Sequence, residues 1–169
     1  MSLNSLNALF LHELRDLYSA EHQLLKALPQ MAQAATHTEL KQAFNDHLEE
    51  TRNQVSRLDR IFSLLGEHAS GEHCNAMEGL IEEGKGLIEK EGNPDVKDAA
   101  LIAAAQRVEH YEIAGYGTAH TFAKLLDHDG IAELLQETLD EEGDANKTLN
   151  KIATGGLFGE GINEEALAV

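Results

Sequence analysis

The sequence predicts an all-α protein built around a bundle of four long helices, and three observations lead to that prediction. Helix-favouring residues are abundant, whereas the 169-residue chain has only two prolines and no tryptophan. Apolar residues recur at steps of three and four over four long segments, the spacing of one helix face. No stretch of useful length alternates apolar and polar residues as a half-buried strand would.

Short segments rich in Gly, Asn, Asp and Pro separate the expected helices. The expected helical ranges are 2–35, 38–66, 75–91, 95–127 and 131–154. The short helix at 75–91 lies between the second and third long helices, so we expect two antiparallel hairpins joined by a crossover. One bundle domain, residues 1–154, and a flexible C-terminal tail at 155–169 follow from this division.

Composition bounds the location and the partners of the protein. The net charge of -17 argues against nucleic acid, whose phosphates such a protein would repel. No segment reaches the roughly 18 uninterrupted apolar residues of a membrane span, and the N-terminus lacks a signal-peptide pattern. A single cysteine, Cys74, cannot form an internal disulfide and suits a reducing compartment. We therefore expect a cytoplasmic protein that binds neither nucleic acid nor membrane.

Two glutamates interrupt apolar stripes. Glu112 continues the stripe between Val108 and Gly115, and Glu21 continues the stripe of the first helix. Burying an ionised carboxylate costs several kcal/mol unless something compensates its charge. Pairing with an arginine or with a tyrosine hydroxyl is one possible compensation, and a metal ion is another.

The two halves of the chain repeat weakly, and the repeat includes glutamates. A shift of 91 residues lays Glu21 on Glu112 and Glu50 on Glu141, so each half holds two glutamates 29 residues apart across a hairpin. Two such hairpins would bring the four carboxylates to one level of the bundle, where two divalent cations would nearly neutralise them. Glu50 and Glu141 lie at the borders of their apolar faces, so a solvated position is equally open for them.

Several motifs resemble one protein family over about residues 6–150. They are YSAEHQLLKAL, HLEET, AMEGLIEE, DAALIAAAQRVEHYEIAGYGT and ETLDEE. These segments resemble the YciF/YciE stress-protein branch of the ferritin-like diiron carboxylate superfamily, which is often labelled a ferroxidase family. The resemblance implies a ferritin-like bundle, an additional crossover helix and a homodimer.

The resemblance also implies a set of metal ligands. Diiron members of the superfamily supply one Glu from the first and third helices and Glu-x-x-His from the second and fourth. Glu21 and Glu112 match the single glutamates, and Glu50 and Glu141 match the glutamates of the paired motif. Two divalent metal ions, iron first and manganese second, are the cofactors that this match implies.

Both histidines of the paired motif are absent from this chain. Asn53 and Asp144 occupy their positions, which argues against standard ferroxidase chemistry. Candidate replacements are His47, one turn before Glu50, and Glu109, which gives the third helix two glutamates as in rubrerythrin-like sites. On the fourth helix, Glu142 and Asp144 remain alternatives.

Two functions from different classes are compatible with this sequence. The first is a stress-response dimetal-carboxylate protein that binds iron and reacts with dioxygen or peroxide, as a ferroxidase-like or peroxide-detoxifying oxidoreductase. The second is a metal-free or redox-inactive structural or interaction bundle that has lost the diiron chemistry, as the absent histidines suggest.

Overall fold

The computed structural model describes residues 4–155 and 159–168. The helices in this part of the chain are α1 (Leu6–Ala34), α2 (Thr38–Leu65), α3 (Asn75–Ile88), α4 (Pro94–Leu125), α5 (Asp129–Thr154) and α6 (Ile162–Leu167). The predicted all-α class is confirmed. Within the described ranges, no helix combines the length and apolar character needed to span a bilayer.

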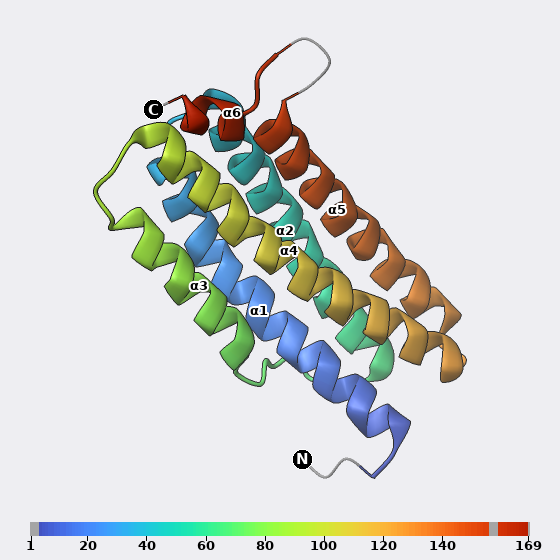
Figure 1. The fold of residues 1–169 in the computed structure, drawn as a ribbon. Coiled ribbons are helices and arrows are strands. Elements are labelled where there is room, and N and C mark those ends of the chain that lie inside the picture. The colour runs from blue at the N-terminus through green and yellow to red at the C-terminus, as the bar shows by residue number, and fades with distance from the viewer. Residues whose placement is uncertain (1–3, 156–158, 169) are drawn as a thin grey trace.

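The four long helices form two antiparallel hairpins, α1–α2 and α4–α5, which pack side by side (Figure 1). The short helix α3 runs back along the length of the bundle and packs against α1 and α4. It thereby connects the end of α2 to the distant start of α4, as the predicted crossover requires. Because of this connection, α1 and α4 point in opposite directions within the bundle.

The C-terminal segment, expected as a flexible tail, contains a short packed helix. Helix α6 contacts α4 and α5 at one end of the bundle, and the side chain of Ile162 is buried in the core. Residues 156–158 and 169 of the expected tail lie outside the described residues. An apolar residue at the start of α6 therefore attaches this segment to the bundle end.

The helix ends are fixed by side chains as well as by turns. Ser5 caps α1 by accepting a hydrogen bond from the backbone N–H of Ala8, and Asn93 caps α4 in the same way. The start of α2 is held from another helix. The buried carboxylate of Asp98 in α4 accepts hydrogen bonds from the backbone N–H groups of Thr36 and His37, and this contact ties the two hairpins together.

A polar layer divides the apolar core into two halves. Along α1, Leu17 and Leu24 on either side of Glu21 belong to different core clusters, and the same change occurs near Gln54 in α2, Glu112 in α4 and Glu142 in α5. All four helices therefore present their buried polar side chains at one level of the bundle.

One glycine near this layer allows close contact between α1 and α4. A Cβ atom at Gly115 would lie 2.8 Å from Cδ2 of the buried Leu17, well inside normal contact distance. We expect Gly115→Ala to lower the free energy of unfolding by about 1–2 kcal/mol, because the overpacking outweighs the gain in helix propensity. Chemical denaturation measures the change.

The control for this substitution is Gly117→Ala in the same helix. Its Cβ would lie 4.0 Å from Leu139, an ordinary contact, so the substitution should raise the stability by roughly 0.5–1 kcal/mol. Equal effects of the two substitutions would contradict the packing described for Gly115.

Candidate metal centre

The side chains of the polar layer point inward because of their positions on the apolar stripes. On α2, His47 and Gln54 continue a seven-residue spacing that begins at Leu40 and ends at Ile61. On α5, Glu142 lies seven residues from both Leu135 and Leu149. A seven-residue step is close to two helical turns, so these polar residues share a face with core leucines and isoleucines.

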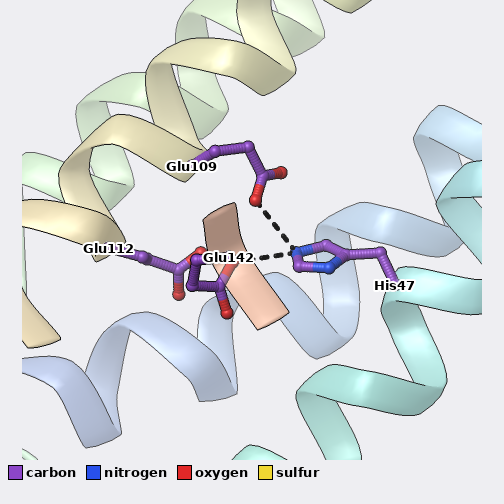
Figure 2. Close-up of side chains that lie close together, drawn as sticks. All are labelled: His47, Glu109, Glu112 and Glu142. Carbon is purple, nitrogen blue, oxygen red and sulfur yellow. Dashed lines mark ion pairs between the residues drawn. The ribbon is translucent and has the colours of Figure 1, made fainter. Parts of the chain in front are cut away.

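Four buried residues from three helices form a cluster: His47 of α2, Glu109 and Glu112 of α4, and Glu142 of α5. Each residue offers one potential ligand atom, an imidazole nitrogen or a carboxylate oxygen, and these four atoms all lie within 4.8 Å of one another. His47 Nε2 is 3.6 Å from Glu109 Oε2 and 3.7 Å from Glu142 Oε2 (Figure 2). The imidazole and the three carboxylates therefore face one common point, and the cluster could hold a metal ion.

A fifth buried group, Glu21 of α1, borders this cluster. Its Oε1 accepts a 2.5 Å hydrogen bond from the hydroxyl of Tyr116, and its Oε2 has no partner. Its charge is close enough to raise the pKa of both Glu112 and Glu142. All four helices of the bundle thus contribute a side chain to the site.

Neighbouring side chains orient the buried cluster. Glu50 Oε2 lies 3.2 Å from His47 Nδ1, so a proton on Nδ1 leaves Nε2 free to accept or to bind a cation. The amide of Gln54 donates a 2.5 Å hydrogen bond to Glu142 Oε1. These contacts hold one imidazole nitrogen and one carboxylate in fixed directions.

Burial and mutual repulsion raise the pKa values of three buried glutamates, Glu21, Glu112 and Glu142. The pKa of Glu21 rises to about 7 through burial, although Tyr116 and His47 act in the opposite direction. Burial and then neighbouring carboxylates raise the pKa of Glu112 and of Glu142 well above its usual value. Burial alone would lower the pKa of His47, but the surrounding glutamates, Glu109 foremost, raise it to about 9. Without a metal, bound protons neutralise part of the negative charge of the site.

The cluster also contains most of the unsatisfied buried polar atoms. Among the described residues, eight buried side-chain N and O atoms lack a hydrogen-bond partner. Seven of these atoms belong to this layer: Glu21 Oε2, His47 Nε2, Gln54 Oε1, Glu109 Oε2, both Glu112 oxygens and Glu142 Oε2. Buried polar atoms are normally paired, so their concentration in one layer fits a cation that would use them as ligands.

The structure brings together some residues of the predicted set and separates others. Glu21, His47, Glu109 and Glu112 meet in the buried layer, and Glu50 borders it. Glu141 also borders the layer, because its Oε2 accepts a 3.1 Å hydrogen bond from Gln54, whereas Asp144 lies outside the layer at the surface.

Arg57 holds Glu141 at the edge of the layer. Its carboxylate accepts two hydrogen bonds from the guanidinium of Arg57, at 2.8 and 2.9 Å, and its side chain is partly exposed. Asp144 pairs with Lys147 at the surface. Glu142, which the sequence offers as an alternative, is fully buried in the cluster. Its seven-residue spacing from Leu135 and Leu149 is the signal that distinguishes it from Glu141.

The fold and the buried glutamate–histidine layer together define a ferritin-like carboxylate bundle. The chain belongs to the family described as domain of unknown function DUF892, whose model matches residues 5–167. The resemblance to the YciF/YciE branch is confirmed as well. The protein YciF of Escherichia coli K12 is 47% identical over 154 residues, which are 90% of this chain and 93% of that protein.

Two solved structures are similar over nearly their whole length. YcfI from Rhodopseudomonas palustris matches with a TM-score of 0.87 and 46% identity, over 90% of this chain and 99% of that one. The E. coli stress protein YciF matches with a TM-score of 0.86 and 46% identity, over 88% of this chain and 94% of that one. The ferritin-like arrangement expected from the sequence is therefore confirmed.

The raised pKa values predict how the stability of the metal-free protein depends on pH. Glu21 has a folded pKa of about 7 against an ordinary 4.5, and His47 about 9 against 6.5. Between each pair of values the folded state binds more protons than the unfolded state, so stability falls as the pH rises from about 5 to 9. Each of these two pKa shifts corresponds to a change of roughly 3 kcal/mol in the free energy of unfolding. Denaturant midpoints of chelator-treated protein across this pH range measure the fall.

The control is Glu21→Gln, which cannot ionise. Its stability should change less between pH 4.5 and 7 than that of the unsubstituted protein. A metal-free protein whose stability rises steadily over the whole range would contradict the assigned shifts.

Proposed function

We propose that this protein is a cytoplasmic stress-response protein that binds two divalent metal ions in the buried layer and, with iron, reacts with dioxygen or peroxide. Iron is the first candidate and manganese the second. The observation that carries the proposal is the set of seven buried polar atoms without a hydrogen-bond partner, which are concentrated in one layer of an otherwise apolar core. The similarity to the E. coli stress protein YciF supports the stress-response role.

The charge of the buried layer matches two divalent cations. Glu21, Glu109, Glu112 and Glu142 carry four negative charges when ionised, and two divalent ions carry four positive charges. His47 binds a metal only in its neutral form, so metal binding must displace the proton that the surrounding glutamates favour. Binding should therefore release protons from His47 and from Glu21, Glu112 and Glu142.

The residues around the layer have separate roles in this proposal. Glu50 would hold His47 with Nε2 directed inward, while Gln54 and the hydroxyl of Tyr116 fix one oxygen each of Glu142 and Glu21. The two apolar halves of the core exclude bulk water above and below the layer. Two Fe(II) ions, when bound, supply the two electrons that reduce dioxygen to hydrogen peroxide or peroxide to water. The buried acids supply and accept protons near that reaction.

The ligand set has more oxygen and less nitrogen than the Glu-x-x-His pattern provides. The histidine of α2 precedes its glutamate, in the order His47-x-x-Glu50, and the cluster residue of α5 is a glutamate alone. Oxygen-rich sites suit manganese as well as iron. Manganese is therefore kept beside iron as a candidate metal in this proposal.

An anaerobic Fe(II) titration of the metal-stripped protein tests the proposal. We expect saturation near two ions per chain, followed by an oxygen- or peroxide-dependent near-ultraviolet absorption band. The same titration with Mn(II) should reach the same stoichiometry. A protein that takes up neither ion would refute the proposed function.

Substitution of adjacent glutamates on α5 tests which of them belongs to the site. Glu142→Gln should weaken Fe(II) binding by at least about tenfold, because it removes a buried ligand charge. Glu141→Gln should change binding by less than about threefold, since Arg57 already neutralises Glu141 at the edge of the layer. Isothermal titration under anaerobic conditions measures both, and the reverse order would assign the site to Glu141.

The competing function is a structural bundle that has lost the metal chemistry. One observation supports this competing function. The pKa values of Glu21 and Glu112 are raised, and protonated carboxyl groups would allow the bundle to fold without metal. That function predicts that Glu112→Leu raises stability without affecting any activity, because an apolar side chain removes buried repulsion. Loss of Fe(II) uptake in the same variant would exclude it.

We also propose that the protein forms a homodimer, as the YciF/YciE resemblance implies. Light scattering of the purified protein tests the oligomeric state independently of metal. A dimeric mass is expected, and a monomer or a large cage would contradict this part of the proposal.

A further inference from the structure

The seam between α2 and α5 is closed along one part and open along another. Near the middle of the bundle, Arg57 and Gln54 of α2 bond to Glu141 and Glu142 of α5 and fill the gap. Toward the start of α2, small side chains face the seam instead, among them Ala43 and Ala145. A pocket opens there. Its lining residues are Ala43, Phe44, Asp46, His47, Glu50, Glu109, Asp144, Ala145, Thr148 and Leu149.

The floor of this α2–α5 pocket belongs to the buried cluster. His47 and Glu109, which line it, are 5% and 2% exposed. His47 Nε2 and Glu109 Oε2 are both buried without a hydrogen-bond partner. The pocket therefore leads from the surface to two potential metal ligands.

The rim of the pocket is acidic. Asp46, Glu50 and Asp144 lie around it, and no Lys or Arg is among the described residues that line it. Asp46 accepts a hydrogen bond from Gln42, and Asp144 pairs with Lys147. Asp144 and Lys147 are 76% and 77% exposed, so solvent screens their pairing and a divalent cation can compete for the carboxylate.

We propose that the α2–α5 pocket is the route by which divalent cations enter the buried layer, with Asp46, Glu50 and Asp144 as transient ligands. This inference rests on the proposed metal binding and adds the path by which the ions reach the buried layer. The exposed carboxylates attract the ion and exchange its water step by step, whereas His47 and Glu109 receive it at the inner end. Few ligands at the rim keep binding there weak, so the ion moves on rather than staying.

The rate at which Co(II) binds to the metal-free protein tests this route. The weak visible absorption bands of aqueous Co(II) shift and intensify when protein ligands replace its water, so stopped-flow absorbance follows uptake directly. The test variant is Asp46→Asn with Asp144→Asn. We expect uptake to slow by about fivefold or more, with the final number of bound ions unchanged.

A matched variant separates the local effect from the overall charge. Glu49→Gln with Asp140→Asn changes the net charge equally on the same two helices, at exposed side chains outside the pocket lining. Its uptake rate should stay within about twofold of the unsubstituted protein. Equal slowing by both double variants would mean general attraction by an acidic surface and would overturn the route.

Blocking the pocket gives a second test that does not depend on charge. Ala145→Leu should fill the opening and slow Co(II) uptake, while Ala114→Leu at an exposed position of α4 should not. Circular dichroism checks that both variants fold. Unchanged uptake in folded Ala145→Leu would overturn the route.

The outcomes distinguish the route from the function on which it rests. Full Co(II) binding with unchanged rates in the pocket variants would contradict the route alone. If the unsubstituted protein binds no Co(II), Fe(II) or Mn(II) at equilibrium, both the proposed function and the route fail.

Discussion

The repulsion among four buried carboxylates is the constraint on which the rest of this structure depends. Glu21, Glu109, Glu112 and Glu142 converge at one level of the bundle, and hydrogen bonds satisfy only some of their oxygens. The apolar clusters on both sides fix the four helices so that the carboxylates cannot move apart. The bundle must therefore supply positive charge at this level, either as protons or as metal ions. The packing of the four long helices thus keeps the carboxylates close together.

Protons and metal ions compete for the same atoms, and this competition links stability to function. Proton binding lets the metal-free bundle fold, and the neighbouring glutamates, Glu109 foremost, are the reason why His47 favours its charged form despite burial. Metal ions would replace these protons as the positive charge of the layer, and the glutamates would then be ionised. The surrounding contacts suit both states, because Glu50, Gln54 and Tyr116 orient the buried side chains from outside the cluster. A site assembled in this way needs little rearrangement when its occupant changes.

The bundle and part of its site could be predicted from the sequence for identifiable physical reasons. Helical periodicity located the long helices within a few residues, and Glu21 and Glu112 stood out because they interrupt apolar stripes. Counting residues across a hairpin pointed to Glu141 rather than Glu142. Neighbouring residues differ by about 100° around a helix axis, and hairpin counting does not resolve such a rotation. Pairing of Glu141 with Arg57 joins residues more than 80 positions apart, so no local pattern reveals it. The packing of α6 depends equally on contacts distant in sequence.

We propose that the buried layer holds metal, and anomalous X-ray diffraction from crystals of the iron-loaded protein tests this proposal most directly. Data collected above and below the iron absorption edge locate the metal without assumptions about ligands. We predict two iron peaks in the layer, between the carboxylates of Glu21, Glu109, Glu112 and Glu142 and beside Nε2 of His47. Iron peaks confined to the surface, with the His47–Glu109 and His47–Glu142 contacts intact, would contradict the claim.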